Sequence, residues 1–306
     1  DDVNYDAIST GKLRRYVSKE NLKDPFKVMK GTLQAFRILG KAKPSVVFSK
    51  GGFVSVPVVV AAWMRKIPVV IHESDYTPGL ANKLAIPFAK QVLATFPETM
   101  QYLPENKAKY VGAVVRSELF RGSKQKGLKV AKLSGSKTVL LIMGGSAGAQ
   151  KINKAVRDQL DTLLKDFEII HICGKGNVDE SISKPGYTQF DYVNEQLSDL
   201  IAATDLVLSR AGANSIFEFL ALKKPMLLIP LSREASRGDQ ILNANSFKKQ
   251  GYAHVLEEED VTDDRLVNEL QQLKASKDEI LKKMRRYETF KAKELVIHTI
   301  KEAGER

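Results

Sequence analysis

The stretch from Leu208 to Pro230 constrains the fold of this chain more than any other. It begins with the end of an apolar strand, passes through a polar turn that contains Gly212, continues as a helix with Glu218 one turn in, and ends in a second apolar strand at Met226–Ile229. This order predicts a β–α–β unit of a parallel sheet. A helix N-terminus favours an anion, and a carboxylate further along can accept hydrogen bonds from a diol such as ribose. The stretch therefore predicts either a nucleotide-diphosphate site or an ordinary turn into a helix.

Length and composition indicate a folded protein with two domains of ordinary size. The chain has 306 residues, of which 43% are hydrophobic and 27% are charged, and this balance excludes an intrinsically disordered chain. The longest apolar run, Val54–Met64, is too short to span a bilayer. The first residues show no signal-peptide pattern. The single cysteine, Cys173, predicts a buried thiol in a reducing compartment, so we expect a cytoplasmic protein.

The charge balance predicts an anionic partner. The formal net charge is +12, which suits nucleic acid, an anionic lipid surface or a phosphorylated substrate. The aromatic residues are not interleaved with the basic ones, and no zinc-finger or helix-turn-helix pattern is present. We therefore expect no nucleic-acid partner.

The first half of the chain alternates predicted strands with predicted helices. Residues 3–8 alternate as a short strand would, and Asp24–Lys41 has the apolar periodicity of an amphipathic helix. A strand at Pro44–Phe48 leads to Gly51 and Gly52, a pair that permits a tight turn and the close approach of a ligand to the backbone. Such a pair is also common in ordinary parallel sheets.

The next predicted strand, Pro68–His72, ends in a group of ionisable side chains. His72, Glu73 and Asp75 follow one another where a parallel strand emerges at the carboxyl edge of its sheet, which is the edge where open α/β sheets bind ligands. The alternative is a capped helix start, in which Asp75 is the cap. Because capping does not require His or Glu, we favour a functional role.

The second half repeats the pattern. Residues 117–136 are rich in Lys, Gly and Ser, which predicts a connection between domains. The strand predicted at Thr138–Met143 is followed by a phosphate-type turn. This turn is neither a P-loop nor GxGxxG, which disfavours a nicotinamide dehydrogenase. The turn residues are Gly144, Gly145, Ser146 and Gly148.

Two later segments also carry a pattern. Asp239, Gln240 and Asn243 fall within about one helical turn, so their side chains can face one site and contact a sugar. The alternative is a solvated helix start that Asp239 caps. The segment Asp278–Glu302 is predicted to be one long charged helix.

Together these patterns predict an α/β fold with two Rossmann-like domains facing across a cleft. The N-terminal domain is expected to be incomplete, because the usual opening strand and Gly-rich turn are not seen. The expected boundaries are 1–116 for the N-terminal domain, 117–136 for the linker and 137–285 for the C-terminal domain. The last helix, 286–306, is expected to return to the N-terminal domain.

Five motifs in this order resemble the MurG family: SKGGFVSVP, HESDYTPGLANK, GGSAGA, SRAGANSIFEFLAL and SRGDQILNA. Members of this family are cytoplasmic N-acetylglucosaminyltransferases that convert lipid I to lipid II in peptidoglycan synthesis. The resemblance covers essentially the whole chain, and HESD and SRGDQ resemble the Gram-positive members. It implies a two-domain GT-B fold that holds UDP-GlcNAc in the C-terminal domain and the undecaprenyl-linked lipid I in the N-terminal domain.

The resemblance also implies the roles of particular residues. Arg116 and Ser146 would contact the diphosphate, and Glu218 would hold the ribose. Backbone groups after two strands would meet the uracil, and the polar start of a later helix would contact the GlcNAc. The implied donor-side residues are Arg116, Gly145, Ser146, Val193, Asn194, Ala213, Asn214, Glu218, Asp239, Gln240 and Asn243; the acceptor-side residues are Gly51, Gly52 and His72.

A membrane-docking surface is also implied. Phe26, Leu33, Phe36 and Trp63 would belong to an apolar patch rimmed by basic residues, which would hold the protein as a peripheral protein on the anionic cytoplasmic face of the cell membrane. Trp63 could instead be a core residue.

One departure from the family concerns the acceptor side. Family members begin with a strand and a GGTxGH-like loop whose backbone binds the acceptor pyrophosphate and whose His is a candidate base, and this sequence starts beyond that loop. A complete sequence of this kind would have impaired acceptor binding, whereas a fragment would receive the loop from the missing part. Within the sequence, Glu73 and Asp75 are the candidate bases. No DxD motif is present, so neither an obligatory metal nor a cofactor is expected.

Three functional hypotheses follow. The first is an inverting transferase, in which the 4-hydroxyl of MurNAc attacks the anomeric carbon of UDP-GlcNAc. The second is a catalytically impaired module that only binds the nucleotide sugar. The third is a UDP-GlcNAc epimerase of the same architecture, which would need no acceptor.

Overall fold

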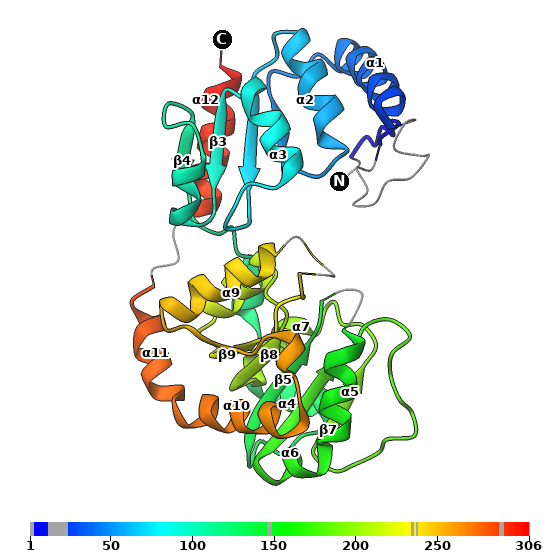
Figure 1. Ribbon diagram of the computed structural model, residues 1–306. Coiled ribbons are helices and arrows are strands. Elements are labelled where there is room, and N and C mark those ends of the chain that lie inside the picture. Colours follow the sequence, from blue (N-terminus) through cyan, green and yellow to red (C-terminus); the bar gives the residue numbers. More distant parts are fainter. Residues whose placement is uncertain are drawn as a thin grey trace. The chain divides into compact units, whose positions relative to one another are not determined.

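A computed structural model of the chain describes residues 3–11, 24–145, 149–233, 236, 238–287 and 291–305. The chain divides into two compact units (Figure 1). Unit 1 comprises Asp1–Val114 and Phe290–Arg306, and unit 2 comprises Val115–Thr289. Each unit contains one parallel β-sheet with helices on its faces. Among the described residues, no helix combines the length and the apolar character needed to cross a membrane.

Unit 1 contains a four-stranded sheet in the order β1-β2-β3-β4. Its strands are β1 (Val47–Ser49), β2 (Val69–Glu73), β3 (Gln91–Ala94) and β4 (Ala108–Tyr110). Its helices are α1 (Asp24–Ala42), α2 (Ser55–Met64), α3 (Leu80–Ala85), η1 (Ile86–Phe88), η2 (Pro97–Tyr102) and α12 (Ala292–Gly304).

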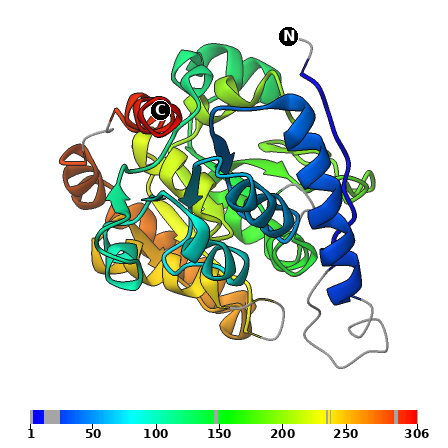
Figure 2. The same cartoon turned by 90° about the horizontal axis from the view of Figure 1, so that it is seen from above.

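The two faces of the first sheet carry separate apolar clusters. Successive side chains of a strand point to opposite faces, so Val69 and Ile71 of β2 join the cluster under α1 and α2, while Val70 joins the cluster under α12. The helices α1 and α12 accordingly lie on opposite sides of this sheet (Figure 2). The C-terminal segment is therefore part of the unit that contains the first strands.

Unit 2 contains a six-stranded sheet in the order β10-β9-β8-β5-β6-β7. Its strands are β5 (Thr138–Met143), β6 (Phe167–Ile172), β7 (Tyr187–Phe190), β8 (Leu206–Ser209), β9 (Met226–Leu228) and β10 (Ala253–Val255). Its helices are η3 (Ser117–Arg121), α4 (Lys124–Ala131), α5 (Gln150–Asp158), α6 (Leu160–Asp166), α7 (Leu197–Ala203), α8 (Ala213–Ala221), α9 (Asp239–Lys249), η4 (Glu258–Asp260), α10 (Asp263–Ala275) and α11 (Lys277–Arg285).

The strands of unit 2 are buried on both faces, as near-continuous apolar runs predict. All residues of β6, β8 and β9 are buried, and the strand β5 lies between β6 and β8. Cys173, directly after β6, is buried and free. The prediction of two parallel α/β domains is confirmed, and so is the β–α–β unit at Leu208–Pro230, which is β8, α8 and β9.

Residues 3–8 were expected to form a strand, and this expectation is wrong. Residues 3–11 contain no strand, and those at positions 3–7 are exposed. Among the described residues, the edge strands β1 and β4 of the first sheet pair only with β2 and β3, so residues 3–8 do not join this sheet. Instead, the Ser9 amide donates to Oε1 of Gln34 at 2.8 Å. Alternation alone does not make a strand without a neighbouring partner.

The expected single helix over Asp278–Glu302 is also wrong. The helix α11 ends at Arg285, and α12 begins at Ala292 in the other unit. At the end of α11, the ammonium group of Lys223 donates to the carbonyl oxygens of Met284 and Tyr287 at 2.7 and 2.9 Å. These bonds hold the end of α11 and the residues directly after it.

Residues 117–136 were expected to be a linker, but they form ordered helices of unit 2. The helix α4 packs directly on α7, and a Cβ atom placed on Gly127 would lie 2.0 Å from the Asp199 carbonyl oxygen. The Asp199 carboxylate also accepts a hydrogen bond from the Ser123 amide at 2.7 Å. The glycines of this segment permit close helix packing.

Candidate functional site

A cavity of about 180 Å³ lies at the carboxyl edge of the second sheet. The residues that follow β5, β6 and β7 form much of its wall, as expected for the ligand-binding edge of an open α/β sheet. The lining residues are Arg116, Met143, Gly145, Ile172, Gly174, Asp191, Tyr192, Val193, Asn194, Leu197 and Ser215. The structure thus brings together Arg116, Gly145, Val193 and Asn194, four of the residues named from the sequence.

The turn after β5 leaves room for a ligand beside its backbone. Gly145 has a φ of 94°, and a Cβ atom there would meet nothing within 4 Å. The helix α5 begins five residues later, at Gln150. Ser146, which the sequence assigned to the same turn, lies outside the described residues. Because the first N–H groups of a helix have no intrahelical partner, the start of α5 suits an anion.

A second wall of the cavity comes from the loop after β7. Val193 is buried, whereas Asn194 and the large aromatic ring of Tyr192 are exposed. Asp191 holds the facing loop, because its Oδ1 accepts a hydrogen bond from the Gly176 amide. Tyr192 and Asp191 were not named from the sequence. Their position directly after a predicted strand was the only available signal.

The first turn of α8 supplies a third wall. Ser215 lines the cavity, Asn214 is exposed, and Ala213 is buried. Gly212 precedes the helix in an extended conformation, and space is open beside its Cα. Ser215 therefore brings the start of α8 to the cavity, whereas Ala213 and Asn214 are not among the lining residues.

Glu218 and Arg116 form a bidentate ion pair. Nε of Arg116 donates to Oε1 of Glu218 at 2.7 Å, and Nη2 donates to Oε2 at 2.9 Å. Hydrogen bonding to Glu218 raises the pKa of Arg116 above its usual range. Glu218 is 9% exposed and Arg116 faces the cavity. Two residues that lie far apart in the sequence, and were assigned to different parts of one ligand, are thus in direct contact.

The three polar residues at the start of α9 have different environments. Asp239 is half-buried at the first helical position. Oε1 of Gln240 accepts a hydrogen bond from the Leu231 amide at 3.1 Å. Asn243 is fully buried and donates to the Ala211 carbonyl at 3.1 Å. Asn243 thus supports the turn before α8, which differs from the expected direct contact of its side chain with a sugar.

A buried ion pair between Arg210 and Glu258 was missed from the sequence. The guanidinium group of Arg210 donates to the Ile229 and Pro230 carbonyls at 3.1 and 3.3 Å and is also bonded to Glu258. It thereby joins the ends of β8 and β9 to η4. The partners lie 48 positions apart, so no local pattern could have indicated this pair.

At the carboxyl edge of the first sheet, His72 is buried and neutral. Lys50 lies 3.1 Å from its Nδ1, and Oγ1 of Thr95 lies 3.2 Å from its Nε2. Because an ammonium group only donates, Nδ1 accepts and Nε2 carries the hydrogen. Burial, and then the charge of Lys50, lower the pKa of His72 to about 4. Burial also lowers the pKa of Lys50.

Glu73 holds the loop that follows β2. Its carboxylate is buried and accepts hydrogen bonds from the Asp75 amide at 3.0 Å, the Gly79 amide at 2.9 Å and Nδ2 of Asn82 at 2.7 Å. A buried carboxylate with three donors is suited to positioning and not to removing a proton from a ligand. Of the two candidate bases, these contacts favour Asp75 and give Glu73 a positioning role. Asp75 is half-buried in the loop that Glu73 holds.

Gly51 and Gly52 both adopt a φ of 86°. A Cβ atom on Gly51 would lie 3.1 Å from Oδ1 of Asn82, whereas one on Gly52 would meet nothing within 4 Å. Oδ1 of Asn82 is buried and has no hydrogen-bond partner among the described residues. The glycine turn, His72 and the Glu73 loop thus lie at one edge of the first sheet.

Exposed apolar residues gather on the helices of unit 1. Phe26 and Leu33 of α1 are 69% and 57% exposed, and Trp63 of α2 is 55% exposed beside the ring of Phe88. Phe36 differs from the expectation, because it is half-buried against the core cluster and lies under the guanidinium group of Arg65.

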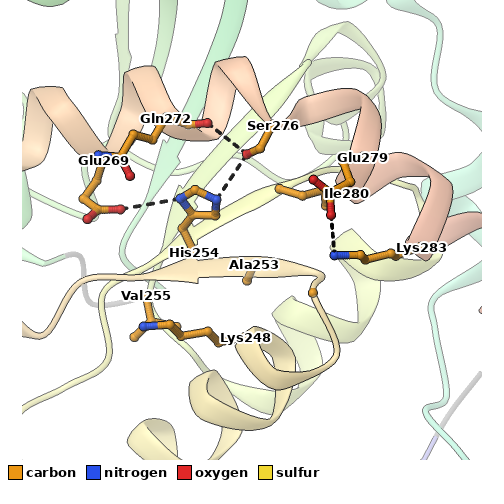
Figure 3. A pocket seen from close by; sticks show the side chains of 11 residues that line it. Lys248, Ala253, His254, Val255, Glu269, Gln272, Ser276, Glu279, Ile280 and Lys283 are labelled. Atoms are coloured by element: carbon orange, nitrogen blue, oxygen red, sulfur yellow. Dashed lines mark hydrogen bonds and ion pairs between the residues drawn. The ribbon is translucent and has the colours of Figure 1, made fainter.

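A further cavity, of about 380 Å³, lies between β10 and the helices α10 and α11 (Figure 3). In it, Nε2 of His254 lies 3.1 Å from Oγ of Ser276, and Nδ1 lies 3.5 Å from the Glu269 carboxylate. This order resembles a hydrolase triad, but Oγ of Ser276 has a closer acceptor in the Gln272 carbonyl at 2.9 Å. The Ser276 hydroxyl donates to this carbonyl, and the contacts of His254 with Ser276 and Glu269 hold the edge strand β10 against α10 and the residue that follows it.

No group of three or more His, Cys, Asp or Glu side chains that could hold a metal ion occurs in the part of the chain that the structure describes. The groups at the unit 2 cavity are a guanidinium, a carboxylate, amides and backbone N–H groups. They suit a ligand that combines a phosphate with hydroxyl and amide groups.

Comparison with known families supports this chemistry. Residues 1–94 match the glycosyltransferase family 28 N-terminal domain, and residues 139–299 match the glycosyltransferase family 28 C-terminal domain. The UDP-N-acetylglucosamine–N-acetylmuramyl-(pentapeptide) pyrophosphoryl-undecaprenol N-acetylglucosamine transferase of Oceanobacillus iheyensis is 65% identical over 98% of this chain and 84% of that protein. The transferase of the same name from Clostridium botulinum is 56% identical over 98% of this chain and 84% of its own.

Solved structures show the same architecture. Acinetobacter baumannii MurG has a TM-score of 0.73 and 25% identity, and the match covers 91% of this chain and 79% of that one. A UDP-GlcNAc 2-epimerase from Neisseria meningitidis has a TM-score of 0.65 but 14% identity over 90% of this chain and 82% of that one. The epimerase match shows a shared fold only.

Proposed function

This chain belongs to the MurG family within glycosyltransferase family 28, and we propose that it transfers GlcNAc from UDP-GlcNAc to the MurNAc of undecaprenyl-linked lipid I, forming lipid II for peptidoglycan synthesis. The observation that carries the proposal is the cavity of unit 2. It gathers a guanidinium, a glycine turn and the start of α8 at one sheet edge, in a chain that shares most of its length with these transferases.

The donor is bound in parts along this edge. The diphosphate takes the glycine turn and Arg116, the uracil meets the backbone of Val193 and Asn194 and of the α8 start, and the ribose hydroxyls donate to Glu218. The GlcNAc contacts Asp239 and Gln240, while Asn243 holds the turn between them. A buried carboxylate is a strong acceptor for a diol, and a guanidinium is a strong donor to phosphate.

The chemistry is a single displacement with inversion. The 4-hydroxyl of MurNAc attacks the anomeric carbon, its proton passes to a base, and the bond to the UDP oxygen breaks. Arg116 and the N–H groups at the start of α5 stabilise the charge that develops on the leaving diphosphate. In unit 1 we assign the base role to Asp75, with Glu73 holding its loop and His72 neutral beside it.

The protein acts at an anionic membrane surface as a peripheral protein of the cytoplasmic face. The exposed residues of α1 and α2 supply apolar contact. A depression of about 800 Å³ in unit 1 is lined by Trp63 and Phe88 together with Arg65, Lys66, Lys90 and Lys107. Each cation near an anionic surface contributes about 1 kcal/mol, so four are enough for reversible docking.

A turnover assay tests the proposal. Purified protein is given UDP-GlcNAc with and without a lipid I analogue, and UDP release and the disaccharide product are measured. The expected result is UDP release that requires the acceptor. Binding of UDP-GlcNAc without turnover would favour the binding module, and conversion of UDP-GlcNAc without acceptor would favour the epimerase.

A further inference from the structure

We propose that the Arg116–Glu218 ion pair is a specificity device, which makes the nucleotide cavity select ligands that carry both a ribose diol and a phosphate. The inference rests on the proposed donor site. It concerns the order of contacts within that site, because the two residues that would hold two parts of the ligand are here bonded to each other.

The pair occupies both oxygens of Glu218. One oxygen accepts from Nε of Arg116 at 2.7 Å and the other from Nη2 at 2.9 Å. Such parallel bonds are among the strongest that a carboxylate forms. A ribose diol needs the same two oxygens as acceptors, so it competes with Arg116 for them.

The two side chains differ in burial. The Glu218 side chain is 12% exposed, and that of Arg116 is 49% exposed. Arg116 lines the cavity, whereas Glu218 does not. A ligand that enters the cavity therefore meets the guanidinium group before the carboxylate, and Arg116 is the partner that can move.

The free-energy cost of separating Arg116 from Glu218 depends on whether the ligand carries a phosphate. A nucleoside replaces the charged donor at the buried Glu218 carboxylate with neutral hydroxyl groups. It also leaves Arg116 without an anionic partner, so the nucleoside gains little binding free energy. A nucleoside diphosphate gives the displaced guanidinium a new anionic partner. The wild-type cavity should thus discriminate strongly against uridine and in favour of UDP.

The proposal predicts that Arg116→Gln changes the affinities for uridine and for UDP in opposite directions. Removing the guanidinium leaves the Glu218 oxygens open, so uridine should bind at least 3-fold more tightly. The same change removes a phosphate contact, so UDP should bind at least 10-fold more weakly. A supporting role for Arg116, in which it only orients Glu218, instead predicts weaker binding of both ligands.

The experiment is calorimetric titration of the whole chain with uridine, 2′-deoxyuridine and UDP. Arg116→Lys serves as a second variant, since one ammonium cannot bridge both oxygens as the guanidinium does; it should also tighten uridine binding while keeping most of the UDP affinity. The exposed Arg121→Gln, at the end of the segment η3 that directly follows Arg116, is the matched control and should change neither affinity. Arg116→Gln should increase the affinity for 2′-deoxyuridine, which lacks one hydroxyl of the diol, less than it increases the affinity for uridine.

The outcomes separate the inference from the proposed site. If Arg116→Gln weakens UDP and leaves uridine unchanged or weaker, the device is overturned while the donor site stands. If Arg116→Gln and Glu218→Gln both leave UDP affinity unchanged, the donor-site assignment itself is overturned.

Discussion

At the scale of single residues, the two buried histidines connect burial with acid sensitivity. Burial lowers the pKa of His72 to about 4, with a further contribution from Lys50, and that of His171 to about 3, with a contribution from Arg157. The unfolded chain binds a proton near the ordinary pKa of 6.5. Between about pH 6.5 and pH 4 the unfolded state therefore holds more protons, and the free energy of unfolding falls as the pH falls.

Because of His72, the free energy of unfolding is expected to fall by about 2 kcal/mol between pH 7.5 and pH 5. Urea unfolding followed by the fluorescence of Trp63, the single tryptophan of the chain, measures it in unit 1. His72→Asn should flatten this pH dependence, whereas the exposed His298→Gln should leave it as in the wild type. Equal pH dependence in His72→Asn and the wild type would show that His72 is not held neutral.

The two carboxylates after β2 should respond differently to mutation. Asp75→Asn removes the proposed base, so kcat should fall by about 100-fold or more while the Kd for UDP-GlcNAc stays unchanged. Glu73→Gln should instead lower the free energy of unfolding by about 1–3 kcal/mol, because buried N–H donors lose a charged acceptor. An unchanged kcat in Asp75→Asn would remove Asp75 from the mechanism.

Single residues also show where sequence reasoning stops. Family motifs and strand ends mark Arg116, Gly145, Val193 and Asn194 in the sequence, and these four residues line one cavity. The sequence did not reveal the Lys50–His72 contact, or the bonds that occupy Glu73. These contacts depend on which side chains of different segments lie next to each other in the fold. A single sequence does not indicate this.

At the scale of secondary-structure elements, the strands were predicted well and the connections were not. Apolar runs such as Val139–Ile142 are long and fully buried, so their pattern is unambiguous. The segment 117–136 has the composition of a linker, yet Gly122 and Gly127 lie closely against the backbone of α7. A glycine-rich composition permits either a flexible linker or close helix packing. The neighbouring element determines which of the two occurs.

Gly127→Ala tests this packing. The added Cβ would lie 2.0 Å from the Asp199 carbonyl oxygen and 2.8 Å from Cβ of Ala203, so the helices must move apart. We expect the free energy of unfolding of unit 2 to fall by about 1–3 kcal/mol, as for other overpacked sites. The exposed Lys126→Ala on the same helix should stay within about 0.5 kcal/mol of the wild type. A stable Gly127→Ala variant would show that α4 is only loosely attached.

At the scale of the whole molecule, we propose that the basic excess and the exposed apolar residues of unit 1 act together in membrane docking. In the proposed docking, the net charge of +12 would draw the protein to an anionic surface, and the exposed Phe26, Leu33 and Trp63 would supply apolar contact. The attraction is screened by salt. Docking should therefore require both anionic lipid and low to moderate ionic strength.

Sedimentation with vesicles measures this docking. The protein should bind vesicles that contain anionic phospholipid and should not bind purely zwitterionic ones. Trp63→Ser should reduce the bound fraction severalfold, and Ile297→Ser, an exposed apolar residue on α12, is the matched control that should not. Binding that is independent of lipid charge and of Trp63 would contradict the docking surface.

The donor site remains the central claim, and calorimetric titration of UDP-GlcNAc tests it most directly. Glu218→Ala should weaken binding at least 10-fold, or about 1.4 kcal/mol, because the ribose loses a buried carboxylate acceptor. The exposed Glu180→Ala in the same unit should bind as the wild type does. If folded Glu218→Ala binds UDP-GlcNAc with wild-type affinity, the nucleotide does not occupy the cavity at the edge of the second sheet.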